Sequence, residues 1–245
     1  MIVNRILSLA LTLCLLQSCD NKTASQKDES IDTSVQYTGA LQQVMHGRME
    51  GTIALKELEN KPHLYALGAV ENLQGEIQVF DGKPLLSKRT DEMVTLTESF
   101  DTSAALLVYT QVPEWQSVAV ASMIRSQGQF EMFLIQEAKK AGIDVSKPFP
   151  FLLTGTVARL DWHIVNWDIN NTQHTEENHL RYGLNGVLSN GDVEIIGFYS
   201  KDHQGVFTHM KENTHMHFKT DNVSLAGHVD RIFLGNNMIL KLPKQ

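Results

Sequence analysis

Three histidines near the C-terminal end have the spacing expected of ligands to one metal ion. His215 and His217 are two residues apart, so on a β-strand both side chains would point to the same face. The polar run 219–222 is typical of a turn, and an antiparallel return strand would place His228 opposite His217. Directly paired residues have Cβ atoms about 5 Å apart. Three neutral imidazoles with an open fourth position are typical of a catalytic zinc centre.

The same residues also fit a strand with two solvent-facing histidines and an unrelated third. His-x-His arises by chance, and the register of a hairpin can slip. The distribution of histidine favours the metal site, because eight of the ten histidines follow residue 160.

The N-terminal segment has the pattern of a lipoprotein leader. Arg5 precedes an apolar run, residues 6–16, that is too short to span a bilayer. Leu-Gln-Ser-Cys at 16–19 resembles the lipobox at which bacterial signal peptides are cleaved before an acylated cysteine. We therefore expect a signal peptide at 1–18 and a lipidated Cys19. An ordinary cleaved signal or a short anchor is the alternative.

The remaining organisation follows from composition. Residues 19–36 are largely polar and predict a flexible tether, so the folded domain is expected at 37–245. The protein would then be membrane-anchored outside the cytoplasm, on the periplasmic side or at the cell surface. A formal net charge of -7 argues against a nucleic-acid partner, which would require clustered lysine and arginine.

Alternating apolar residues and turn signals predict mostly antiparallel strands. A helix is expected at 126–140, where apolar residues form one stripe before Gly142, and a shorter one at 52–59. The prolines of segment 147–150 favour a seam between halves at 37–146 and 147–245. The expected fold class is α+β, with antiparallel or mixed β-sheets and few helices.

Five segments, in order and spacing, carry a resemblance to a known family. They are GAVENLQGE at 68–76, GTV at 155–157, GFYS at 197–200, HMHF at 215–218 and AGHVD at 226–230. The chain resembles the alpha-acetolactate decarboxylase family over nearly all of its folded length. The resemblance implies two packed halves with zinc between them, held by His215, His217 and His228. It also implies a carboxylate beside the metal, which here is Glu76.

The function implied by the resemblance is zinc-dependent decarboxylation of 2-acetolactate to acetoin. The substrate is a small 2-hydroxy-3-keto acid whose hydroxyl and ketone oxygens can chelate the ion, which acts as a Lewis acid. Organic cofactors are not required. Glu76 is the candidate for relaying a proton or holding the substrate hydroxyl.

The sequence departs from the family at several positions. The family's catalytic arginine aligns with His163, which can donate a proton near neutral pH but lacks the two-pronged guanidinium that holds a carboxylate. His163 is therefore the candidate acid. The family also places a C-terminal glutamate at the metal, whereas no glutamate follows Glu212 here. A longer loop at 202–209 adds His203 and His209 as candidate residues of an additional pocket.

Two other functions remain open. One is a related metal lyase that acts on another small 2-hydroxy-3-keto acid, which would account for the departures. The other is a non-catalytic lipoprotein that binds a metal or another ligand. The expected partners are thus a small keto acid and a membrane reached through the lipid anchor, with a homodimer as a candidate assembly.

Overall fold

The computed structural model describes residues 31–171, 173, 178 and 181–245. The predicted signal peptide, Cys19 and residues 19–30 of the predicted tether lie outside the described residues, as do His174 and His179. Residues 31–245 form one compact unit. Within the described part of the chain, every helix is too short or too polar to cross a bilayer.

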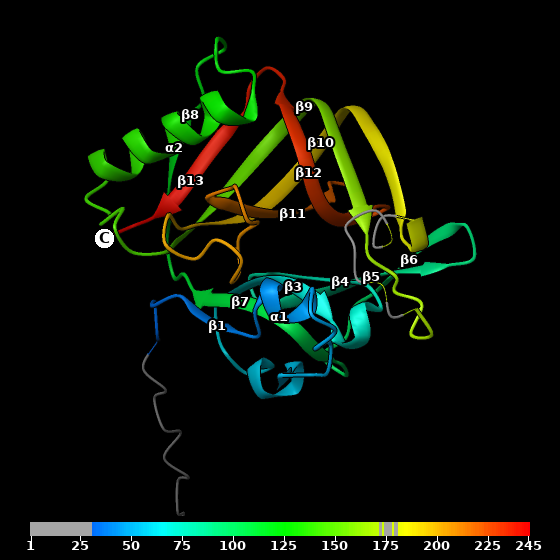
Figure 1. The fold of residues 1–245 in the computed structure, drawn as a ribbon. Coiled ribbons are helices and arrows are strands. Elements are labelled where there is room, and N and C mark those ends of the chain that lie inside the picture. Colours follow the sequence, from blue (N-terminus) through cyan, green and yellow to red (C-terminus); the bar gives the residue numbers. More distant parts are fainter. Residues whose placement is uncertain (1–30, 172, 174–177, 179–180) are drawn as a thin grey trace, which may run out of the picture. The chain divides into compact units, whose positions relative to one another are not determined.

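The first of two antiparallel sheets has the strand order β1-β7-β3-β4-β5-β6, with β2 paired to β7 (Figure 1). Its strands are β1 (Gln36–Thr38), β2 (Ile53–Ala54), β3 (Leu64–Val70), β4 (Glu76–Phe80), β5 (Lys83–Thr90), β6 (Met93–Thr97) and β7 (Ser103–Gln111). Asp81 and Gly82 join β4 to β5, both at positive φ. This is the tight hairpin that an Asp-Gly pair predicts.

The second sheet has the order β10-β11-β12-β9-β13-β8. Its strands are β8 (Trp115–Ala119), β9 (Phe149–Ile164), β10 (Leu184–Tyr199), β11 (Thr214–Thr220), β12 (Ala226–Leu234) and β13 (Ile239–Pro243). Because β9 also pairs with β10, strands β9 to β12 close into a ring of pairings. Asn190 is a residue at positive φ inside the single strand β10.

Few of the described residues are helical. The helices with defined bounds are α1 (Leu41–Val44), α2 (Gln127–Lys140) and the 3₁₀ turns η1 (Leu55–Leu58) and η2 (Glu71–Leu73). Helix α2 matches the prediction: Ser126 caps its N-terminus in a reciprocal pair with Gln129, which satisfies two backbone N–H groups. Its apolar stripe packs on the second sheet. The predicted fold class is therefore confirmed.

Two details of the prediction differ from the structure. Residues 52–59 do not form an α-helix, because Ile53 and Ala54 pair with β7 before the turn η1. Leu55 and Leu58 are both buried, and their spacing suits a 3₁₀ turn as well as a helix. The change of sheet falls at 112–114 rather than at 146/147, since β8 pairs with β13 and Pro150 lies within β9.

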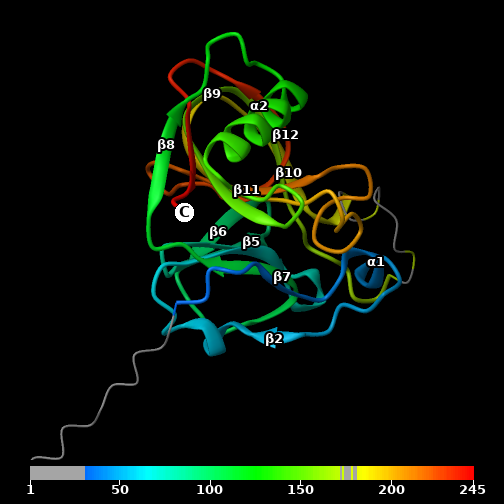
Figure 2. The same ribbon diagram turned by 90° about the vertical axis from the view of Figure 1, so that its left-hand side faces the viewer.

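The two sheets pack against each other through a shared apolar cluster (Figure 2). The first sheet contributes Tyr65, Leu67, Leu106 and Val108, and the second contributes Leu152, Ile196 and Phe198. Strand β12 crosses close to β4 and β5 at this junction. Polar groups placed here are shielded from water, which strengthens their electrostatic interactions.

Candidate metal centre

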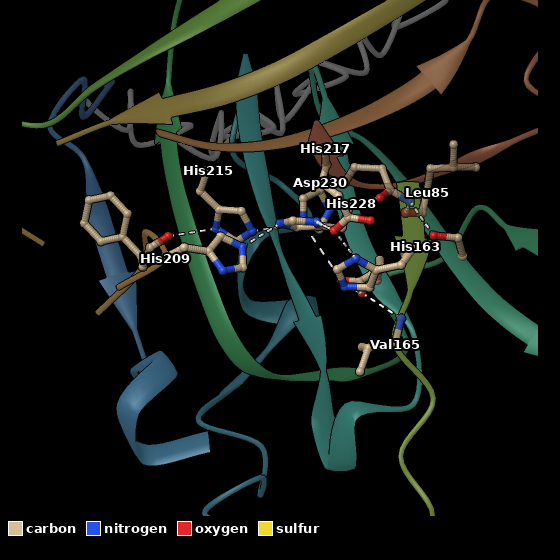
Figure 3. Close-up of polar contacts among 12 residues, drawn as sticks. Leu85, His163, Val165, His209, His215, His217, His228 and Asp230 are labelled. Atoms are coloured by element: carbon tan, nitrogen blue, oxygen red, sulfur yellow. Dashed lines mark hydrogen bonds and ion pairs between the residues drawn. The ribbon is translucent and has the colours of Figure 1, made fainter. Parts of the chain in front are cut away.

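The predicted histidine hairpin is formed by β11 and β12. His217 pairs directly with His228, and His228 pairs in turn with His163 on β9. Three imidazoles therefore stand in a row on adjacent strands, on the side that faces the first sheet (Figure 3). His217 is fully buried, and His215 and His228 are nearly so, at 7% and 5% exposure. The predicted register is confirmed, and the alternative of solvent-facing histidines is wrong.

Hydrogen bonds at Nδ1 set the tautomer of each ring. His215 Nδ1 lies 2.8 Å from the carbonyl oxygen of Phe207, which accepts only. His217 Nδ1 lies 3.2 Å from Gln78 Oε1, and His228 Nδ1 lies 3.3 Å from Asp230 Oδ1. Each Nδ1 therefore carries the proton, and each Nε2 carries a lone pair. This outer-shell arrangement is typical of metal-ligating histidine.

The side-chain amide of Gln78 is oriented by its own partners. Its Nε2 donates to the carbonyl of Leu85 at 2.6 Å and lies 3.2 Å from Ser87 Oγ. Its Oε1 is thus left to accept from His217. Gln78 is fully buried on β4, so the first sheet fixes the orientation of a histidine that belongs to the second.

The three imidazole rings cluster. His217 Nε2 lies 3.2 Å from His215 Nε2, and the centroids of the His215, His217 and His228 rings are 5.0–5.4 Å apart. Four ligands at about 2.0–2.1 Å around tetrahedral zinc are separated by about 3.3 Å. Lone pairs that face one another at such distances repel unless a cation lies among them. The close His215–His217 pair therefore favours a cation between the two rings. Among the described residues, however, the imidazoles that together meet the spacing for one ion are His209, His215 and His228, and His217 approaches them through His215.

A fourth imidazole lies beside His215 and His228. His209 Nε2 lies 2.9 Å from His228 Nε2, and potential ligand atoms of His209, His215 and His228 all lie within 4.8 Å of one another. His163, His228 and Asp230 form a second such group. In that group, however, Asp230 accepts from the Nδ1 atoms of both rings, which leaves it on the outer side of His228.

Burial keeps the ligand histidines neutral. It lowers the pKa values of His215 and His217 well below the ordinary value, with further lowering from neighbouring imidazoles. Burial and the nearby His163 lower the pKa of His228 to about 3. Unprotonated imidazole is the form that binds metal, so the site is ready for an ion at neutral pH.

Glu76 enters the same junction from β4. Its Oε1 accepts from the backbone N–H of Val165 at 2.8 Å, and its two oxygens lie 3.8 Å from His163 Nε2 and His217 Nε2. Burial raises the pKa of Glu76 to about 7, although His163 opposes the rise. Near neutral pH this carboxyl group can both give and take a proton.

His163 lies between two carboxylates. Its Nδ1 is 2.6 Å from Asp230 Oδ1, and its Nε2 faces Glu76. Burial would raise the pKa of Asp230, but hydrogen bonds from His163 and His228 hold it below its ordinary value, so Asp230 is ionised. An ionised Asp230 fixes the proton on His163 Nδ1 and directs Nε2 toward Glu76, as the aspartate of a catalytic triad does.

The other residues considered from the sequence lie elsewhere. His203 is bonded to Ser200 Oγ at 2.8 Å and stacks on Phe207, so it is not part of the histidine cluster. Arg159, on the same strand as His163, pairs with Asp161 at 2.7 Å.

Gln78 and Asp230 were missed by the sequence reasoning. Gln78 lies two residues beyond Glu76 and therefore on the same face of β4, so alternation was the signal that could have found it. Asp230 lies at a register shift in β12, between Val229 and Arg231, which alternation does not predict.

Comparisons with known proteins agree with this architecture. Residues 35–241 match the family model described as alpha-acetolactate decarboxylase. Among curated proteins, none matches the sequence. The solved structures that the fold resembles include a Staphylococcus aureus protein of unknown function similar to alpha-acetolactate decarboxylase, with 16% identity, a TM-score of 0.68 and 86% of each chain covered.

The alpha-acetolactate decarboxylase of Bacillus subtilis strain 168 has 14% identity and a TM-score of 0.67, again with 86% of each chain covered. The acetolactate decarboxylase from Bacillus subtilis subspecies spizizenii has 14% sequence identity and a TM-score of 0.68, with 86% of each chain covered. At these identities the structures show a shared fold, whereas the family model spans most of the sequence. The chain belongs to the alpha-acetolactate decarboxylase family.

Proposed function

We propose that this protein is a zinc-dependent decarboxylase that converts 2-acetolactate to acetoin. The observation that carries the proposal is the cluster of neutral, buried imidazoles beside buried Glu76, where the two sheets meet. His215, His217 and His228 would hold the ion, because neutral imidazole suits zinc. Bound zinc would supply positive charge that stabilises the electron pair left on the substrate when carbon dioxide departs.

His163 is proposed to deliver the proton that replaces carbon dioxide. The bond between the carboxylate carbon and C2 breaks, its electron pair stays with the substrate, and a proton is needed to complete acetoin. The charge of Asp230, 2.6 Å from Nδ1, stabilises the protonated ring of His163, which then donates from Nε2.

Glu76 is proposed to accept a hydrogen bond from the substrate hydroxyl and to exchange protons with His163. The Val165 N–H holds one of its oxygens in place, and the distance to His163 Nε2 is 3.8 Å. Burial keeps water from competing for these groups.

The activity itself tests the proposal. Zinc-loaded protein is expected to produce acetoin from 2-acetolactate above the uncatalysed rate, and protein stripped by a chelator is expected to lose this activity and regain it with zinc. Absence of acetoin from fully metallated protein, with either enantiomer as substrate, would overturn the assignment.

A related lyase reaction is the second candidate, and His163 is the observation that favours it. An imidazole held by Asp230 presents one donor where the family's arginine presents two in parallel. A different 2-hydroxy-3-keto acid could suit that single donor better. Metallated protein would then turn over such an acid faster than 2-acetolactate in a parallel assay of carbon dioxide release.

We also propose that the domain is held at a membrane outside the cytoplasm through lipidated Cys19. The support is the charge, the apolar length and the cysteine position of the leader. Cys19→Ser should abolish labelling with a radioactive fatty acid and release the protein from the membrane fraction, because the polar tether has little apolar surface. Labelling that persists in this variant would contradict the anchor.

A further inference from the structure

A loop between β10 and β11 carries an imidazole that none of the preceding roles uses. His209 lies in residues 200–213, which connect the two strands beside the histidine cluster (Figure 3). Its Nε2 is 2.9 Å from His228 Nε2, and its ring centroid is 5.7 Å from that of His215. The loop thus brings a further nitrogen to within 4.8 Å of ligand atoms of His215 and His228.

The loop is built to hold this position. Phe207, 1% exposed, anchors it in the apolar cluster between the sheets. Its backbone folds on itself, with Thr208 N–H donating to the carbonyl of His203 and Gly205 N–H to that of Thr208. The carbonyls of Gly205 and Val206 accept from the start of α1.

The base of the loop is closed as well. The backbone N–H of Ser200 donates to the carbonyl of Asn213 at 2.7 Å, and the side chain of Asn213 donates to Glu131 on α2. With both the base and the tip of the loop held, the position of the His209 backbone is defined before any ion binds, which reduces the entropic cost of ligation.

The same loop also orients a ligand that the hairpin supplies. The carbonyl of Phe207 accepts from His215 Nδ1 at 2.8 Å and so fixes the tautomer of His215. His209 follows Phe207 by two residues in the same loop. His228 Nδ1 is committed to Asp230, so the His228 Nε2 that faces His209 bears a lone pair. A cation shared by the two Nε2 atoms would satisfy both.

We infer that His209 is an additional protein ligand of the metal, so that the ion is held by four imidazoles instead of three. This inference rests on the proposed metal centre and deepens it. Four protein ligands fill the tetrahedron that a catalytic zinc usually leaves partly open. The oxygen atoms of a substrate would then bind the ion either by raising its coordination number above four or by displacing His209. His209 would therefore compete with the substrate for a coordination position.

Cobalt(II), which replaces zinc and absorbs visible light, gives a readout independent of activity. The Co²⁺ spectrum and the Zn²⁺ affinity, measured against a competing chelator, are compared for wild type, His209→Ala and His203→Ala. His203 is the matched control, since it lies in the same loop but outside the cluster. His217→Ala is included as a test of the centre itself, and circular dichroism establishes that each variant folds.

The expected result is that His209→Ala changes the intensity of the Co²⁺ bands and weakens zinc binding by at least about 10-fold, the smallest loss usual for an outer-shell partner. Oxalate, a bidentate oxygen chelate, should bind metallated His209→Ala more tightly than wild type. His203→Ala should match wild type in all three measurements.

Two outcomes separate the possible failures. An unchanged spectrum and affinity in His209→Ala, alongside metal loss in His217→Ala, would show that His209 only hydrogen-bonds to His228 and would overturn the inference. Unchanged metal binding in both variants would instead overturn the proposed centre. If His209→Ala fails to fold, His209→Gln provides the same comparison, because glutamine keeps a similar size and polarity but has no imidazole nitrogen.

Discussion

Replacing His217 with alanine is expected to reduce zinc affinity by more than about 100-fold and acetoin production to the background rate. A ligand should contribute more than the outer-shell groups whose loss typically costs 10–100-fold. His217 is also fully buried, and its Nδ1 is the donor for Gln78 Oε1. Metal content by mass spectrometry after dialysis and an acetoin assay measure the two effects.

The structural cost of this substitution is predictable as well. In the variant, the buried Oε1 of Gln78 loses the Nδ1–H of His217 as its hydrogen-bond donor. This loss should lower the free energy of unfolding by about 1–3 kcal/mol without preventing folding. His46→Ala is the matched control, because His46 is exposed and its ring bonds to the carbonyl of Gln42 on α1, away from the histidine cluster. Stoichiometric zinc in a folded His217→Ala protein would place the ion elsewhere.

Removing the acid is the second large effect. His163→Ala should lower the rate of acetoin formation by roughly 10²–10⁴, the usual contribution of a general acid, while zinc remains bound. Glu76→Gln should act in the same direction, since it keeps the shape of the side chain and the acceptor for Val165 N–H but loses the ability to exchange a proton. Steady-state rates at fixed zinc occupancy measure both.

The control for these variants is Glu114→Gln, because Glu114 is exposed and pairs with Lys244 away from the site. If His163→Ala keeps the wild-type rate, another group supplies the proton. If instead it loses zinc together with activity, His163 supports the ligands and does not act as the acid.

Local patterns in the sequence predicted the parts of this architecture that depend on neighbouring residues. The two-residue spacing of His215 and His217, with a turn before His228, was enough to predict the pairing observed in β11 and β12. The capping residue Ser126 and Gly142 similarly defined α2. Alternation and turn chemistry act over a few residues, so they can be recognised in one sequence.

Features that depend on long-range packing could not be predicted in this way. His209 reaches the cluster because Phe207 is buried between sheets whose relative placement no local pattern encodes. The pairing of β8 with β13 places β8 in the second sheet, and α2 packs against that sheet. In the sequence alone, the prolines at 148 and 150 indicate a boundary between the halves more strongly than residues 112–114 do. Pro150 is tolerated because it lies at the start of β9, where the strand pairs with β10 and the pairings with β13 and β12 begin further along the strand.

Anomalous scattering at the zinc edge, measured on crystals of zinc-loaded protein, tests the metal centre most directly. We expect one strong peak per chain, at about 2.0–2.1 Å from Nε2 of His215, His217 and His228. A peak located between His163 and Asp230, or on the surface with those three nitrogens more than about 3 Å away, would contradict the account.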